Sequence, residues 1–282
     1  MRCKIRPTLY FALALYFITG DFSFAAEVEQ PVKSEVDLYL QANPAGILLQ
    51  GFLYTALPRE EALKGEKVVP ALEAGLGAAS SPAYGKLALK GIWRPAPFFL
   101  LVAQYDLLYF YGQYGGTLSF GSGGAPFGDR VIKERKGEEE SGLAHHLSLA
   151  PTFYARVGRI LLRNQTELSL YRFPGRGPYF HELEYDTLVT NRDYLLANRF
   201  NVMAEAENFL KGILYVGPGY EYVRAHDARL TRQRVYGQAY WEAAAPAKTF
   251  GIPHFMVQAG VNIEDRNREK EGFALIGVGT QY

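Results

Sequence analysis

The sequence predicts an all-β fold, a single antiparallel transmembrane β-barrel, from three features. Its last segment, 272–282, reads GFALIGVGTQY, alternates strictly in side-chain character and stops on an aromatic residue. Its first segment, 1–25, has the pattern of a secretory signal peptide. Between these two segments, one stretch after another carries apolar side chains at every second position. Each feature is typical of a chain that is exported and crosses a bilayer as strands.

The signal-peptide pattern begins with three basic residues, Arg2, Lys4 and Arg6, before an apolar run over 9–18. Ser23 and Ala25 then place small residues two apart, as a signal peptidase requires. The apolar run is shorter than the roughly 20 residues of a membrane-spanning helix, although an N-terminal anchor helix is the alternative. The one cysteine, Cys3, lies before this run, so its removal with the signal peptide excludes disulfides.

Composition excludes some functions. The chain has 30 basic and 29 acidic residues. Three of the basic residues and one of the acidic residues lie in 1–25, so the mature chain would have 27 basic and 28 acidic residues. This balance gives no reason to expect nucleic acid as a partner. Aromatic residues make up 14% of the chain, with 20 tyrosines against 2 tryptophans, as in barrels with aromatic girdles.

Five strands are predicted before the longest polar insertion, and their apolar stripes include Leu72, Leu76, Leu89, Trp93 and Tyr105. We expect these strands at 35–42, 46–57, 67–79, 84–94 and 98–116. Seven strands are predicted after it, with stripes that include Leu147, Leu168, Val216, Val235 and Val257. We expect these at 143–157, 159–173, 193–207, 209–224, 229–244, 250–264 and 272–282.

The final strand, 272–282, presents Ala274, Ile276, Val278, Thr280 and Tyr282 on one face. Its length matches the roughly 9–11 residues of a membrane-crossing strand. Chain ends usually fray in soluble proteins, whereas the last strand of a closed barrel must pair with the first. The pattern therefore predicts that the chain ends inside the barrel wall.

Alternation alone also suits a soluble β-sandwich with its apolar face inside. The signal peptide, the terminal strand and the tyrosine content favour the membrane barrel, and the chain resembles bacterial outer-membrane β-barrel proteins as a class. This resemblance implies localisation in the outer membrane, lipid and lipopolysaccharide as partners, periplasmic termini and long extracellular loops.

Strand parity then places two loops outside, near 117–142 and 174–192, with the stretch 178–192 forming a hairpin above the rim. The expected organisation is a signal peptide at 1–25, a periplasmic segment at 26–34 and a barrel over 35–282. The barrel has about twelve strands, an even number as expected, with ten or fourteen also open.

The polar face would line the interior, where rings of charge would select solutes. The predicted lumen-lining residues are Lys86, Lys90, Arg94, Asp106, Arg156, Arg163, Glu167, Arg199, Lys211, Glu221, Arg232 and Arg234. We expect a narrow channel for passive passage or uptake of a small solute. The alternative is a non-conducting structural or surface-binding barrel, in which these charges pair and plug the interior.

A lipid-modifying esterase is the second alternative, because His146 and Ser148 share one face of a strand and resemble the His-x-Ser pair of outer-membrane phospholipase A and lipid A deacylases. Leu147, Leu149 and Phe153 take the lipid face, so this pair points into the lumen, and no orienting acid is evident at a suitable spacing.

The loops offer two further candidate sites. Glu182, Glu184 and Asp186 follow one another on the proposed hairpin and would bind Ca²⁺ as a row of carboxylates. The mixed charges over 129–140 would contact lipopolysaccharide. No histidine spacing predicts a metal site, and no cofactor motif is present.

Overall fold

The computed structural model describes residues 32–42, 46–56, 72–173, 175, 177–191, 193–245 and 251–282. The predicted signal peptide and most of the segment 26–34 lie outside these ranges, as do the first residues of the strand expected at 67–79.

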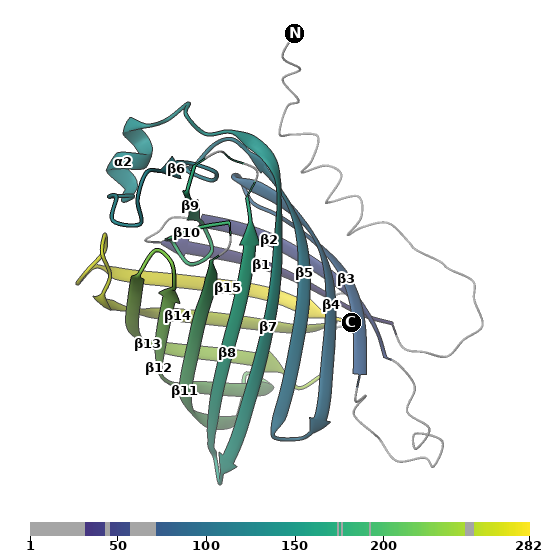
Figure 1. Cartoon of the computed structure of the whole chain (residues 1–282). Helices are drawn as coiled ribbons and strands as arrows, with labels where there is room; N and C mark the ends of the chain where they lie inside the picture. The colour runs from purple at the N-terminus through teal and green to yellow at the C-terminus, as the bar shows by residue number, and fades with distance from the viewer. Residues whose placement is uncertain are drawn as a thin grey trace.

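Twelve strands of the described residues close into one antiparallel barrel, which confirms the predicted fold and strand number (Figure 1). The first five are β1 (Val32–Ala42), β2 (Gly46–Ala56), β3 (Leu72–Ser80), β4 (Tyr84–Ala96) and β5 (Phe99–Tyr111). The other seven are β7 (Ser141–Val157), β8 (Ile160–Arg172), β11 (Tyr194–Phe209), β12 (Gly212–Ala225), β13 (Leu230–Ala243), β14 (Ile252–Glu264) and β15 (Gly272–Gln281). Strand β5 ends before the expected residue 116, because Gly112 turns the chain with a φ of 68°.

The barrel closes where β1 pairs with β15, in register from Glu35 opposite Gln281 to Ala42 opposite Ala274. Ser34 and Tyr282 extend the pairing, since each backbone N–H donates to the other's carbonyl oxygen at 3.0 and 2.8 Å. The last residue of the chain is therefore held in the wall, as the terminal pattern predicts. We call the end of the barrel where β1 begins and β15 stops the terminal end, and the opposite end the loop end.

The outer surface of the barrel is apolar. Leu76, Leu87 and Leu89 are each more than half exposed although they lie in the middle of strands. Aromatic residues lie on this surface near both ends, with Tyr109 and Tyr194 at the loop end and Trp93, Phe153, Phe209 and Phe255 at the terminal end. Such an apolar band between two aromatic girdles is the surface that meets hydrocarbon in a membrane barrel.

No helix among the described residues is long and apolar enough to span a bilayer.

Two long segments, 112–140 and 173–193, connect strands at the loop end. The first contains β6 (Ser119–Phe120) and the helix α2 (Asp129–Glu134), and the second contains β9 (Tyr179–Glu182) and β10 (Thr187–Val189). Strands β10, β9 and β6 form a small separate sheet in that order (Figure 1). We call this sheet and the β9–β10 turn the plug.

The plug lies inside the barrel, so the expected hairpin above the rim is wrong in its placement. Phe180, Leu188 and Val189 of the hairpin are fully buried and pack with Leu195 and Val223 of the wall. Burial of each of these apolar side chains stabilises the hairpin by about 1.5–3 kcal/mol. The lumen is the place where the hairpin can bury them against the wall without entering the lipid.

Because the outer surface is apolar, a charge placed on it should strongly lower the stability of the barrel. Leu89→Arg places a cation on the lipid face near the middle of β4 and should destabilise the barrel in lipid vesicles by about 2–4 kcal/mol. Urea unfolding in vesicles measures this, with Ser122→Arg on an exposed loop as the control. A loss below about 0.5 kcal/mol at Leu89 would mean that this face meets water.

Candidate functional site

The interior of the barrel is the candidate site, because alternate residues of every strand point there. Eleven of the twelve predicted lining residues lie on inward positions of their strands. Lys211 is the exception and that prediction is wrong. It lies with Leu210 in the turn between β11 and β12, where both residues have positive φ, because β11 extends to Phe209.

Most of these charges pair across neighbouring strands. Glu221 of β12 lies opposite Arg199 of β11 and Arg234 of β13, and its carboxylate contacts both at 2.8 and 2.9 Å. Arg232 contacts the same carboxylate at 2.8 Å. Nearer the terminal end, Glu73 accepts from both Lys33 and Arg94 at 3.0 Å. Pairing removes much of the cost of holding ions in a confined interior.

The plug completes this pattern of pairs. Lys86 of β4 donates to Glu184 of the hairpin at 3.1 Å, and its ammonium lies 3.7 Å from Asp106 of β5. Arg199 donates to the hydroxyl of Tyr185 at 2.9 Å, and Arg232 donates to the Tyr185 carbonyl. The hairpin is therefore fastened to opposite sides of the wall.

The predicted carboxylate row of the hairpin does not form a shared cation site. Glu182 accepts from the backbone N–H groups of Glu184 and Tyr185 at 2.9 and 2.7 Å, and so closes its own turn. Glu184 is taken by Lys86 and by the hydroxyl of Tyr84. Asp186 accepts from Arg268 at 2.6 Å and contacts His181 at 2.8 Å. Alternation suggested one row, but the turn at 183–186 sends each carboxylate to a different partner.

The ionisation of the hairpin carboxylates follows from these contacts. Burial, and then the neighbouring charge of Glu184, raises the pKa of Glu182 to about 7. Burial also acts to raise the pKa of Glu184, but the charges of Lys86 and His146 outweigh it and lower this pKa to about 2. For Asp186, His181 and Arg268 overcome burial and hold the pKa well below its usual range.

The candidate esterase pair lies beneath the plug. His146 is 4% exposed, stacks on Tyr171 at 4.4 Å between ring centroids and contacts Asp106 through Nδ1 at 2.9 Å. Asp106 is the orienting acid that the sequence did not reveal, since it lies directly opposite His146 on β5. Among the described residues no hydrogen bond joins His146 to Ser148, and His146 Nε2 is buried without a partner. The pair is closed off from the lipid face, where a lipid substrate would arrive.

A cavity of about 1270 Å³ remains beside the plug. It runs from charged residues at the loop end, including Asp129 and Lys136, past Lys86 and Glu184 to Tyr39 and Gln50 within the barrel. The cavity lies on one side of the lumen, because the plug packs against the strands of the other side. In the described chain, the fully buried apolar residues around the plug belong to β4, β5, β7, β8, β11, β12, β13 and the loops. Strands β1, β2 and β15 therefore face the cavity.

A closed barrel with an apolar exterior and a charged interior crosses a membrane with strands. The described strands of this chain form such a barrel. The sequence matches no family model and no curated protein.

Several solved structures are similar in fold. The KdgM porin in complex with disordered oligogalacturonate has a TM-score of 0.41 and 8% identity, over 89% of this chain and 98% of that one. An outer membrane channel from Pseudomonas putida F1 has a TM-score of 0.44 and 11% identity, over 93% and 98%. LpxR from Salmonella typhimurium has a TM-score of 0.45 and 7% identity, over 88% and 99%. The likeness is one of fold.

The Glu221 cluster predicts a stability effect. Glu221→Gln leaves Arg199, Arg232 and Arg234 crowded without their shared carboxylate and should cost about 3–5 kcal/mol, since it breaks a buried pair on one side only. Urea unfolding in vesicles measures it. Glu134→Gln is the matched control, because its partner Arg130 is solvent-exposed and such pairs contribute about 0–1 kcal/mol. Equal effects of the two substitutions would contradict the role assigned to Glu221.

The hairpin carboxylates predict a pH effect. The stability that Glu182 contributes is fully present below its unfolded pKa of 4.5 and is lost as pH rises through about 7. That of Glu184 is present above 4.5 and is lost as pH falls towards about 2. Raising the pH from about 5 to about 8 should therefore loosen the hairpin, with opening roughly tenfold to hundredfold more frequent.

Amide hydrogen exchange over 179–189, corrected for the intrinsic rate at each pH, measures this opening. Glu182→Gln should reduce the pH dependence, and the part that remains would come from loss of the His146 charge that faces Glu184. Glu184→Gln should weaken the hairpin at both pH values and leave the direction of the pH effect unchanged. Exchange that stays equally slow at both pH values in the wild type would overturn the assignment to Glu182.

Proposed function

We propose that the chain is a narrow channel for the passive passage or uptake of a small polar solute. The cavity beside the plug carries this proposal, because it joins the solvent at the loop end to the polar interior along β1 and β2. A barrel of twelve strands is narrower than the 16–18 strands of open aqueous porins, so a partly filled lumen leaves room for small solutes only.

In this proposal the β9–β10 hairpin is the gate. Glu184 lies on the wall of the cavity and is about a third exposed, whereas its partner Lys86 is nearly buried. Release of the tip would separate Glu184 from Lys86 and Tyr185 from Arg199 and Arg232, while Phe180 and Leu188 keep their contacts in the apolar cluster. Both charges of the pair would then line a wider passage.

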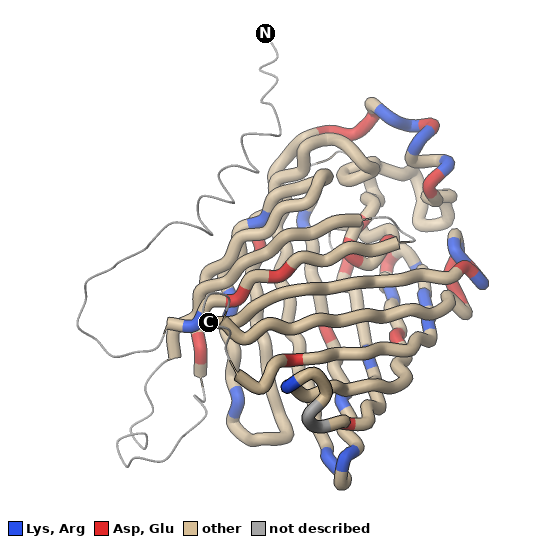
Figure 2. The backbone as a smooth tube through the Cα atoms, turned by 180° about the vertical axis from the view of Figure 1, so that it is seen from behind, with Lys and Arg blue, Asp and Glu red and all other residues tan. Residues whose placement is uncertain are grey.

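The loop end is proposed to face the cell exterior. The segment around α2 contains both acidic and basic residues (Figure 2). Arg130 and Glu134 of α2 are exposed, as a contact with the phosphates and cations of lipopolysaccharide requires. A soluble solute would meet this surface first and then enter the cavity behind it.

A non-conducting barrel is the second candidate function. The full burial of Phe180, Leu188 and Val189 favours it, because an apolar seal of this kind keeps water and ions from the lumen that it fills. Under this alternative the barrel serves envelope integrity or surface binding, and the cavity is only a recess open at the loop end.

Conductance in planar bilayers separates the two functions. We expect a small wild-type conductance, a several-fold rise for Glu184→Ala because the gate loses its hold on Lys86, and a loss for Gln50→Trp because the indole fills the cavity floor. Lys270→Gln, on an exposed turn, is the control. Silence of both the wild type and Glu184→Ala, with folded protein in the bilayer, would favour the non-conducting barrel.

A further inference from the structure

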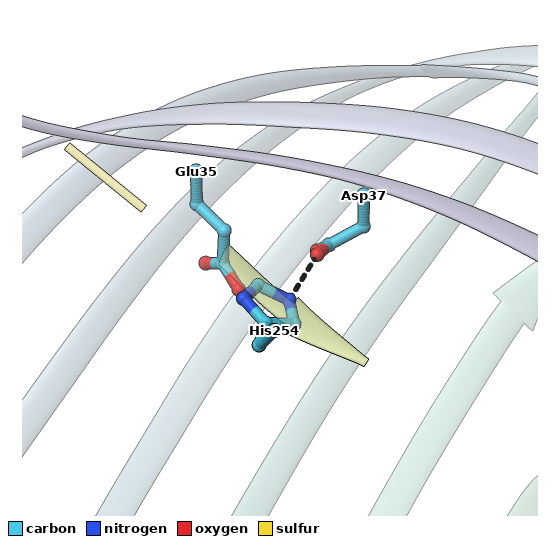
Figure 3. Close-up of side chains that lie close together, drawn as sticks. All are labelled: Glu35, Asp37 and His254. Atoms are coloured by element: carbon cyan, nitrogen blue, oxygen red, sulfur yellow. Dashed lines mark hydrogen bonds and ion pairs between the residues drawn. The ribbon is translucent and has the colours of Figure 1, made fainter. Parts of the chain in front are cut away.

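Three side chains at the terminal end of the lumen come together from the two strands that flank β15. Glu35 and Asp37 lie on β1 and His254 lies on β14, and their ligand atoms lie within 4.8 Å of one another (Figure 3). His254 Nε2 is 2.8 Å from Asp37 Oδ1. The set consists of one imidazole and two carboxylates.

The backbone of β15 allows this approach. Gly279 lies opposite Asp37 on one side and opposite His254 on the other. A Cβ atom at residue 279 would clash with both Asp37 Oδ1 and His254 Nε2. Glycine at this position therefore leaves the space above β15 to the side chains of its two neighbours.

In each of the two carboxylates, one oxygen already accepts a hydrogen bond from a neighbouring side chain. Gln50 donates to Asp37 Oδ2 at 3.1 Å, and the hydroxyl of Tyr54 donates to Glu35 Oε2 at 3.2 Å. Lys90 in turn donates to the Tyr54 hydroxyl at 3.0 Å. Ligating carboxylates in metal sites have such supporting hydrogen bonds, which fix the orientation of the remaining oxygen.

Two other histidine–aspartate pairs in the described chain show what is unusual here. The Asp106 carboxylate beside His146 has Lys86 within 3.7 Å, and the Asp186 carboxylate beside His181 has Arg268 at 2.6 Å. Beside His254, the third group is the second carboxylate, Glu35. Asp37 is 1% exposed, and among the described residues no lysine or arginine forms an ion pair with it. A buried carboxylate in this position needs a compensating positive charge, which either a protonated His254 or a bound cation can supply.

We propose that Glu35, Asp37 and His254 bind a divalent transition-metal ion such as Zn²⁺. An imidazole nitrogen with carboxylate oxygens suits Zn²⁺, whereas Ca²⁺ takes six to eight oxygen ligands and Mg²⁺ keeps several waters. Zinc bonds to these atoms are about 2.0–2.2 Å long, so the three side chains would close around the ion from their present separations within 4.8 Å, with water completing the coordination.

The position of the site gives the ion a structural role. It links the first strand of the barrel to β14 across β15, the strand on which the barrel closes. An ion that binds only the folded chain stabilises it by an amount that rises with the logarithm of its free concentration once this exceeds the dissociation constant. Bound metal should therefore hold the closing seam together.

Zinc titration of the full folded chain tests the proposal. After treatment with a chelator, calorimetry should show one Zn²⁺ bound per chain, and thermal unfolding should move to higher temperature with Zn²⁺. Asp37→Asn and His254→Gln should each weaken binding by about tenfold to hundredfold or more, and Gln50→Ala, which removes only a supporting hydrogen bond, by about tenfold.

His146→Gln is the matched control, because it removes the histidine of a similar buried pair and should leave zinc affinity unchanged. Glu35→Gln is a second test at a less buried ligand, should Asp37→Asn prevent folding. No zinc binding by the wild type, unchanged binding in His254→Gln, or an equal thermal shift with Ca²⁺ would each overturn the proposal. Zinc binding is measured without transport, so this result is independent of whether the barrel conducts.

Discussion

The pairing of β1 with β15 is the constraint on which the rest of the structure depends. In hydrocarbon no water satisfies a free backbone group, so a strand-built wall must close on itself. Ser34 and Tyr282 complete that closure with reciprocal hydrogen bonds. Once closed, the wall must turn its leucines to lipid, and every second residue then points into a lumen too narrow to hydrate many charges. The interior therefore has to supply its own counter-charges.

It does so in two ways. In the wall, strand register places Glu221 between Arg199 and Arg234, so the pairs form as soon as the strands align. At the loop end the hairpin adds Glu184 to Asp106 as a partner of Lys86, and adds Tyr185 to Glu221 as a partner of Arg199 and Arg232. The plug is thus part of the electrostatic balance of the lumen, and any movement that opens a passage must separate charges that it now pairs.

The sequence could predict the barrel, its twelve strands and most inward residues, because period-2 patterning records which face a side chain takes. It could not predict register, and the site depends on register. Asp106 reaches His146 across one strand pair, and Asp37 reaches His254 across two, from opposite ends of the chain. The hairpin was expected at the correct place in the chain, but its apolar residues did not reveal whether they pack in the lumen or above the rim.

The open side of the lumen links the two proposals. The plug packs mainly against β4 to β13, which leaves β1 and β2 facing the cavity. Among the described residues, Glu35 and Asp37 of β1 form no ion pair with a plug residue. Gln50 belongs to both regions, since it lines the cavity and donates to Asp37. Neither the wall nor the plug brings a lysine or arginine into an ion pair with Asp37, so the compensating charge comes from a protonated His254 or from a bound cation. The side of the barrel through which a solute would pass is thus also the side where a cation has a reason to bind.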